Sequence, residues 1–163
     1  MDKQQKNILA IVGILLAVSV IATVAVFFVT RDKSDFTPPP FDETAKKGIP
    51  TVEDQSALYQ KVAHEDFAFS LCWSPLLEDT SAKVYFSSEH TNSVYLLIKL
   101  YDAEGNEIGQ SGLVRPGEYV ENISITDLPD TDETISAKVF SYEPKTYYSA
   151  GTVSLELSLR AVQ

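Results

Sequence analysis

The stretch VSLELSLR, residues 153–160, decides the fold class, because apolar and polar side chains alternate along it without a break. Successive side chains of a β-strand point to opposite faces, so this alternation predicts a strand with one buried and one solvated face. The stretch VYLLIKLY, residues 94–101, is apolar on both faces, which is typical of a strand in the middle of a sheet. The two patterns together predict an all-β domain.

Turn signals divide the rest of the region into further short strands. Gly105 in DAEGN, residues 102–106, can adopt the positive φ of a bulged hairpin loop, and RPGE, residues 115–118, matches a type II turn. Strands are also predicted at residues 67–72, 82–87, 107–114, 119–125 and 135–142. About seven strands joined by short polar loops predict an immunoglobulin-like or fibronectin-like antiparallel β-sandwich over residues 65–163.

The amino-terminal part predicts a membrane anchor. Residues 8–29 contain no charged side chain. A helix of this length reaches roughly 33 Å, enough to cross a hydrocarbon core of about 30 Å. A cleaved signal peptide is the competing reading, but the run is too long, and the small pair Thr23 and Ala25 precedes more apolar residues. We expect an uncleaved signal anchor in the cell membrane, with residues 1–7 in the cytoplasm and the carboxyl-terminal domain outside it.

Residues 30–50 contain Pro38, Pro39 and Pro40 and few side chains that could pack, which predicts an extended, Pro-rich stalk. A ligand for a proline-reading domain is the alternative interpretation. Residues 51–62 predict one short helix, with Thr51 as its N-cap and acidic residues in the first turn.

Composition excludes several classes of function. The chain has 23 acidic and 13 basic residues, a net charge of −10, which repels phosphate backbones, so we expect no nucleic-acid partner. Cys72 is the one cysteine, so no intrachain disulfide can form. His64 and His90 stand alone in predicted loops and form no metal-binding or catalytic motif. We therefore expect a non-enzymatic protein without a cofactor.

Six tyrosines are candidates for either a binding role or a packing role. An exposed aromatic row would stack on sugar rings or anchor a protein partner, whereas tyrosines in strands otherwise serve cross-strand packing. The candidates are Tyr95, Tyr101, Tyr119, Tyr142, Tyr147 and Tyr148.

An acidic loop before the strand at 135–142 is a candidate calcium site. It carries four carboxylates, and calcium binds oxygen ligands of this kind, although the EF-hand spacing is absent and a solvated loop is the alternative. The candidate ligands are Asp127, Asp130, Asp132 and Glu133.

Two stretches carry a resemblance to a known family. Residues 92–125, NSVYLLIKLYDAEGNEIGQSGLVRPGEYVENISI, and residues 141–151, SYEPKTYYSAG, resemble an uncharacterised family of small membrane-anchored, Ig-like β-sandwich proteins of Gram-positive bacteria. The resemblance implies a sandwich fold and an envelope location, and it supplies no active-site residues. A disulfide-poor outer domain also fits a Gram-positive surface.

These features predict a membrane-anchored, extracytoplasmic binding or structural module. The lipid bilayer would hold residues 8–29, and the outer domain would contact another cell-envelope protein. The alternative is a carbohydrate or cell-wall glycan binding module that uses a tyrosine-bearing sheet face.

Overall fold

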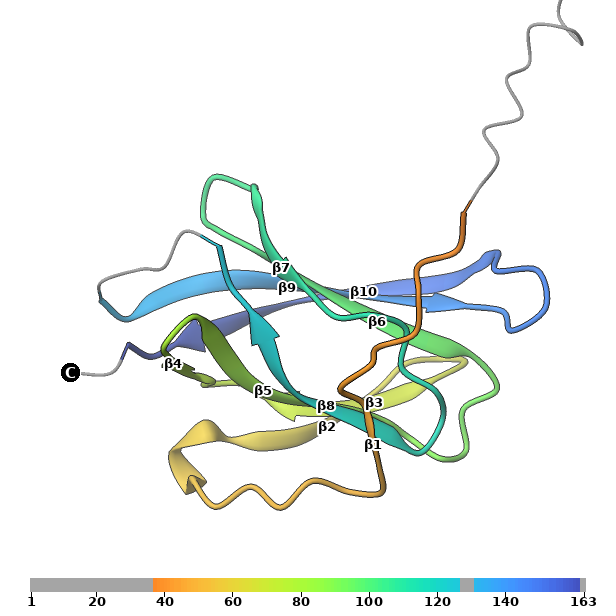
Figure 1. The fold of residues 1–163 in the computed structure, drawn as a ribbon, viewed down its shortest axis with the longest axis horizontal. Coiled ribbons are helices and arrows are strands. Elements are labelled where there is room, and N and C mark those ends of the chain that lie inside the picture. Colours follow the sequence, from red (N-terminus) through yellow and green to blue (C-terminus); the bar gives the residue numbers. More distant parts are fainter. Residues whose placement is uncertain (1–36, 127–130, 162–163) are drawn as a thin grey trace, which may run out of the picture. The chain divides into compact units, whose positions relative to one another are not determined.

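The computed structural model describes residues 37–126 and 131–161, and the chain from Pro38 onward forms one compact unit. Two antiparallel β-sheets stack face to face (Figure 1). The predicted cytoplasmic head and signal anchor, residues 1–29, lie outside the described residues. Within the described ranges, no helix is long and apolar enough to span a bilayer.

The first sheet has the strand order β1-β8-β5-β3-β2, and β4 also pairs with β5. The second sheet has the order β10-β9-β6-β7. The chain passes from one sheet to the other between β5 and β6, between β7 and β8, and between β8 and β9. The bounds are β1 Lys46–Lys47, β2 Tyr59–Ala63, β3 Ala68–Cys72, β4 Leu76–Glu78, β5 Ser81–Ser88, β6 Tyr95–Tyr101, β7 Glu107–Gln110, β8 Glu118–Ser124, β9 Glu133–Tyr142 and β10 Ser149–Leu159.

The hydrophobic core lies between the sheets, and the alternating stretch contributes to it as predicted. Leu157 and Leu159 of β10 are buried, while the alternating residues Ser154, Glu156 and Ser158 are exposed. The β6 stretch is buried on its core side at every second residue from Leu96 to Leu100. The predicted all-β class is confirmed, and each predicted strand has a counterpart among the observed elements. Only β7 is markedly shorter than predicted.

The short helix predicted at residues 51–62 is wrong. One 3-10 turn, η1 at Gln55–Ala57, is followed at once by β2. Asp54, and not Thr51, is the N-cap, and its side chain accepts a hydrogen bond from the Ser56 N–H at 2.9 Å. Leu58 ends the turn with φ 55°. An isolated helix of this length is marginal in water, so the ladder that β2 forms with β3 decides the conformation instead.

The stalk prediction is also wrong for residues 41–48. Phe41 forms a bridge with Leu113, β1 pairs with β8, and the Gly48 N–H donates to the Gly117 carbonyl at 2.9 Å. The segment is extended, as expected, but it is an edge of the sandwich and not a spacer. Backbone groups on the free edges of Leu113 and β8 need partners, and this segment supplies them. The domain therefore begins well before the predicted residue 65.

Residues 48–58, here called the strap, run from β1 to β2, which lie at opposite edges of the first sheet. Ser70 and Cys72 of β3 alternate with the core residues Phe69 and Leu71, so they point away from the core. They are nevertheless only 6% and 0% exposed. The strap covers them, and its Ala57 carbonyl accepts a hydrogen bond from the Ser74 N–H at 3.0 Å.

Candidate binding surface

The structure brings three of the six candidate tyrosines together on the outer face of the second sheet. Tyr95 of β6 and Tyr142 of β9 are direct neighbours in the ladder. The ring centroids of Tyr95 and Tyr147 lie 6.3 Å apart, in the range of favourable aromatic pairs. All three side chains are partly exposed. Here these residues and Phe41 are called the aromatic cluster.

Phe41 and Arg115 extend the cluster, and the sequence prediction missed both. The Phe41 ring meets the Tyr95 ring edge to face, with centroids 5.0 Å apart and an interplanar angle of 80°. The guanidinium carbon of Arg115 lies 3.6 Å from the centre of the Phe41 ring. Such a contact is a cation–π interaction, which orients both side chains at the surface. The cluster therefore has a cationic end.

Backbone pairing holds Phe41 in this position. The Asp42 N–H donates to the Leu113 carbonyl at 3.0 Å, and the Leu113 N–H donates to the Pro40 carbonyl at 2.8 Å. The Gly112 N–H donates to the Asp42 carboxylate at 2.8 Å. A Cβ atom at Gly112 would lie 2.5 Å from the Asp42 backbone nitrogen, so only glycine permits this close approach. Sequence periodicity carries no signal for such a pairing, because it joins segments about 70 residues apart.

The β9–β10 hairpin supplies Tyr147 and Tyr148. Its turn is closed by the Tyr147 N–H donating to the Glu143 carbonyl at 2.9 Å and the Glu143 N–H donating to the Tyr148 carbonyl at 3.0 Å. Tyr147 has φ 55°, which is uncommon for a non-glycine residue. This conformation places its ring near Tyr95, while the next residue, Tyr148, is 73% exposed.

Of the three remaining candidates, Tyr101 and Tyr119 lie away from the cluster. Tyr101 lies at the far end of β6, where the Lys138 ammonium is 4.6 Å from its ring centre. Tyr119 belongs to β8 in the first sheet and faces Lys46 and Ser87 in the ladders. The six candidate tyrosines therefore do not form a single row, and the binding candidates reduce to one end of one face.

The structure describes two of the four candidate calcium ligands, Asp132 and Glu133. Asp127 and Asp130 lie outside the described residues. Asp132 accepts a hydrogen bond from the Ala161 N–H at 3.0 Å, and Glu133 begins β9 opposite Leu159. Among the described residues no group of three or more metal-ligating side chains is found. The described part of the loop thus shows a structural role for Asp132.

The histidines and the cysteine are placed apart from one another. The His64 ring lies against Phe67, with centroids 5.0 Å apart. His90 lines a cavity of about 200 Å³ under the start of the strap, together with the hydroxyl groups of Tyr59 and Ser87. Burial raises the pKa of the Cys72 thiol to about 12, so this thiol is protonated at neutral pH.

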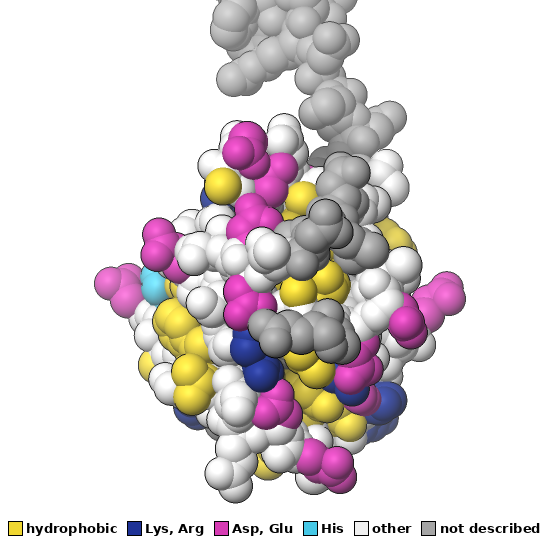
Figure 2. Space-filling view, turned by 90° about the vertical axis from the view of Figure 1, so that its left-hand side faces the viewer, with side chains coloured by type: hydrophobic (Ala, Val, Ile, Leu, Met, Phe, Trp, Pro, Cys, Tyr) yellow, Lys and Arg dark blue, Asp and Glu magenta, His cyan; other side chains and the backbone are white. Residues whose placement is uncertain are grey.

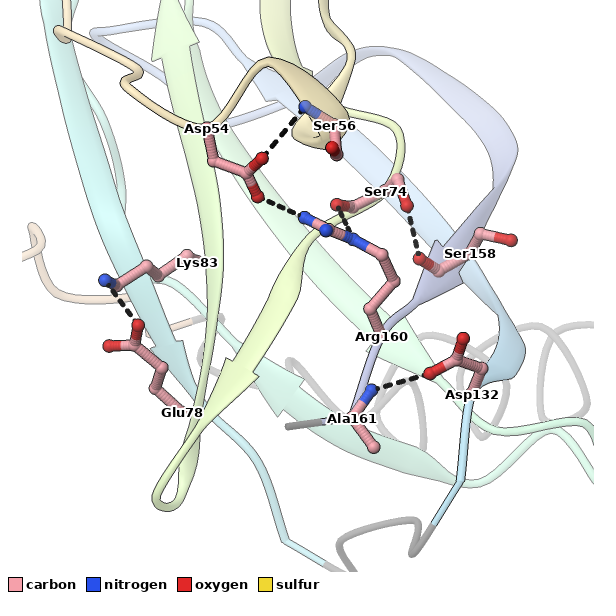
Figure 3. A network of polar contacts seen from close by, with 9 residues as sticks. All are labelled: Asp54, Ser56, Ser74, Glu78, Lys83, Asp132, Ser158, Arg160 and Ala161. Carbon is pink, nitrogen blue, oxygen red and sulfur yellow. Dashed lines mark hydrogen bonds and ion pairs between the residues drawn. The ribbon is translucent and has the colours of Figure 1, made fainter. Parts of the chain in front are cut away.

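A polar network fastens the strap to the end of β10 (Figure 3). The Arg160 guanidinium forms an ion pair with Asp54 and donates a hydrogen bond to the Ser74 carbonyl at 3.1 Å. The hydrogen bond from Arg160 holds the pKa of the Asp54 carboxyl below its usual range. Ser74 Oγ donates to the Ser158 carbonyl at 3.3 Å. The network therefore joins three segments that are remote in sequence.

The surface agrees with the acidic composition. Acidic side chains are spread over the face seen in Figure 2, with fewer basic side chains between them. Several lysines are engaged by glutamates, as in the pair of Lys99 and Glu107 at 2.7 Å. The Arg115 guanidinium at the aromatic cluster is 3.5 Å from Glu118.

Comparison of the chain with protein-family models, with curated proteins and with solved structures found no match. The resemblance to membrane-anchored proteins of Gram-positive bacteria therefore stays a prediction.

Proposed function

We propose that this chain is a membrane-anchored, extracytoplasmic and non-enzymatic binding module, and that its aromatic cluster contacts another protein of the cell envelope. The gathering of Phe41, Tyr95, Tyr142 and Tyr147 on one outer face, with Arg115 beside them, carries the proposal. Tyrosine, phenylalanine and arginine are enriched in protein interfaces, and tyrosine and arginine are enriched among their hot spots. Two of these tyrosines come from strands, which form a rigid platform.

The proposal also includes the assignment of the two-sheet domain to a specific type of β-sandwich. The strand orders β3-β5-β8 and β7-β6-β9-β10, with the chain crossing between sheets at three points, support an immunoglobulin-like or fibronectin-like sandwich. Domains of this architecture frequently serve as cell-surface modules. The apolar run at residues 8–29 supports the membrane anchor.

A carbohydrate is the second candidate ligand. Tyr148 is 73% exposed next to Tyr147, so an aromatic ring is available to stack on a sugar. Pull-down on purified wall polysaccharide distinguishes the two ligands. Saturable binding that is lost in Tyr147→Ala and Tyr148→Ala variants would favour the glycan over the protein.

Photo-crosslinking in living cells tests the protein partner. A photoreactive amino acid replaces Tyr148 in the full chain, and in a matched control it replaces Gln60, an exposed residue of β2 in the other sheet. We expect one discrete envelope-protein adduct from position 148 and none from position 60. Equal adducts from both positions would contradict a partner that binds the aromatic cluster.

Protease treatment of whole cells tests the location. We expect protease added outside the cells to remove a tag placed after Gln163 and to leave a tag before Met1 intact. Protection of the carboxyl-terminal tag would contradict the extracytoplasmic placement.

A further inference from the structure

Strand β10 has a free edge, because it ends the second sheet and pairs only with β9 among the described strands. Along this strand the N–H and C=O groups of alternate residues point away from β9. Ser158 shows which residues these are, because its N–H donates to the Trp73 carbonyl at 2.9 Å, outside the sheet. Thr152, Ser154 and Glu156 alternate in step with Ser158, so their N–H and C=O groups also point away from β9. Their backbone groups have no partner within the described residues.

Both ends of this free edge are defined by the fold. At Ser158 and Arg160 the segment Trp73–Leu77 covers the edge: Arg160 donates to the Pro75 carbonyl and accepts from the Leu77 N–H, at 2.9 and 2.8 Å. At the other end a β-bulge between Ser149 and Gly151 interrupts the register. The open part therefore comprises Thr152, Ser154 and Glu156, with Ser154 at its centre.

The open part is complementary to itself. If two β10 strands pair antiparallel about Ser154, then Ser154 faces its own copy and Thr152 faces Glu156 of the second copy. All backbone groups of the three residues then find partners, in three hydrogen-bonded pairs of residues. No glutamate faces a glutamate, so no like charges are directly opposed. On the core side, Val153 faces Leu155 of the second copy, and both are only partly buried in one chain.

The covering segment limits the length of the proposed ladder. Ser158 would face Ala150 of the second copy, but the Ser158 N–H already donates to the Trp73 carbonyl, so the pairing is confined to residues 152–156. Strand β2, one of the two outer strands of the first sheet, is a poorer candidate. It has five residues, and its central residue, Lys61, is exposed and charged, a feature that discourages edge pairing.

We infer that β10 is a self-association edge, at which a second copy of this chain adds its own β10 antiparallel about Ser154. The two second sheets then join into one continuous sheet. The inference is independent of the aromatic cluster, since it rests on the backbone of β10.

Cysteine cross-linking of the full chain in detergent micelles tests the register. Cα atoms of a hydrogen-bonded antiparallel pair lie about 5.5 Å apart, within disulfide range. We expect Ser154→Cys to form a disulfide-linked dimer under mild oxidation. Thr152→Cys alone and Glu156→Cys alone should not, because each would be roughly 13 Å from its own copy. An equimolar mixture of these two variants should cross-link. The unaltered chain is the background control, since Cys72 is buried.

Ser154→Pro tests the backbone hydrogen bonds. Its N–H points to the free edge, so proline there removes no hydrogen bond within the chain. Added to both members of the Thr152→Cys and Glu156→Cys pair, it should lower the cross-linked yield at least tenfold and leave the Tm nearly unchanged. An unchanged yield would overturn the inference.

A photoreactive residue at position 154 also detects any other protein that binds to this edge. With a photoreactive residue at this position in cells, an adduct of twice the chain mass supports self-association. An adduct with a different protein, or equal cross-linking of Ser154→Cys and Thr152→Cys alone, would overturn it.

Discussion

The two outer faces of the sandwich differ in what covers them. On the first sheet, the strap buries Cys72 and Ser70, which are 0% and 6% exposed. On the second sheet, Tyr95 and Tyr142 stay partly exposed and Tyr148 is 73% exposed. Ser70 and Cys72 of β3 are thus part of a packed layer, whereas Tyr95 and Tyr142 on the outer face of the second sheet are partly accessible. We expect substitutions in the covered layer to affect stability and substitutions at the exposed tyrosines to affect the proposed binding.

Gly112→Ala should have the largest effect, because it disturbs the segment that carries Phe41. The added Cβ would meet backbone atoms of Asp42 and Phe41, none of which can rotate away. We expect the free energy of unfolding to fall by about 3 kcal/mol, the upper end for overpacking. Urea denaturation measures this change. Gln110→Ala, at an exposed residue of the same region, is the control and should change it by less than about 0.5 kcal/mol.

Cys72→Ser should lower the free energy of unfolding by about 2 kcal/mol, because it buries a hydroxyl group beneath the strap. Cys72→Ala should cost less, since it adds no polar group. Thermal and urea unfolding compare the two variants. The native Cys72 thiol should also resist a thiol reagent at pH 8, because burial raises its pKa to about 12. Rapid labelling of the folded chain would show that the strap does not cover this face.

Tyr147→Ala combined with Tyr148→Ala should change the free energy of unfolding by less than about 1 kcal/mol, since both residues lie in a surface turn. Binding to the partner should nevertheless be lost, because Tyr147 belongs to the aromatic cluster and Tyr148 is its exposed neighbour in the chain. Calorimetry checks the stability and co-purification checks the binding. A large loss of stability would place these tyrosines in a packing role instead.

The smallest expected effect is a pH dependence at Asp54. Its hydrogen bond with Arg160 lowers the pKa of the carboxyl in the folded state below the unfolded value of about 3.9. The resulting stabilisation is therefore present above pH 4 and is lost as the pH falls through the folded-state pKa. Asp54→Asn should flatten the fall of Tm below pH 4 and leave its slope near pH 7 unchanged. An identical acid slope in both proteins would contradict the ion pair.

The sequence predicted the strands well, and it failed where tertiary pairing decides the conformation. The alternation in residues 153–160 reports a burial pattern that each residue carries locally. The pairing of Phe41 with Leu113, the covering of Cys72 and the ion pair of Asp54 with Arg160 join distant segments. No period or motif records such contacts. The tyrosines were recognised by their number, but the separation of Tyr101 and Tyr119 from the others required the sheet order.

In-cell cross-linking with mass spectrometry tests the binding surface most directly, when it is applied to two matched double variants of the full chain. One variant replaces Tyr147 and Tyr148 by alanine, and the other replaces Tyr101 and Tyr119, which lie away from the aromatic cluster. We predict that the first variant loses its envelope-protein partner and that the second keeps it. Retention of the partner by the first variant would contradict the proposed binding surface.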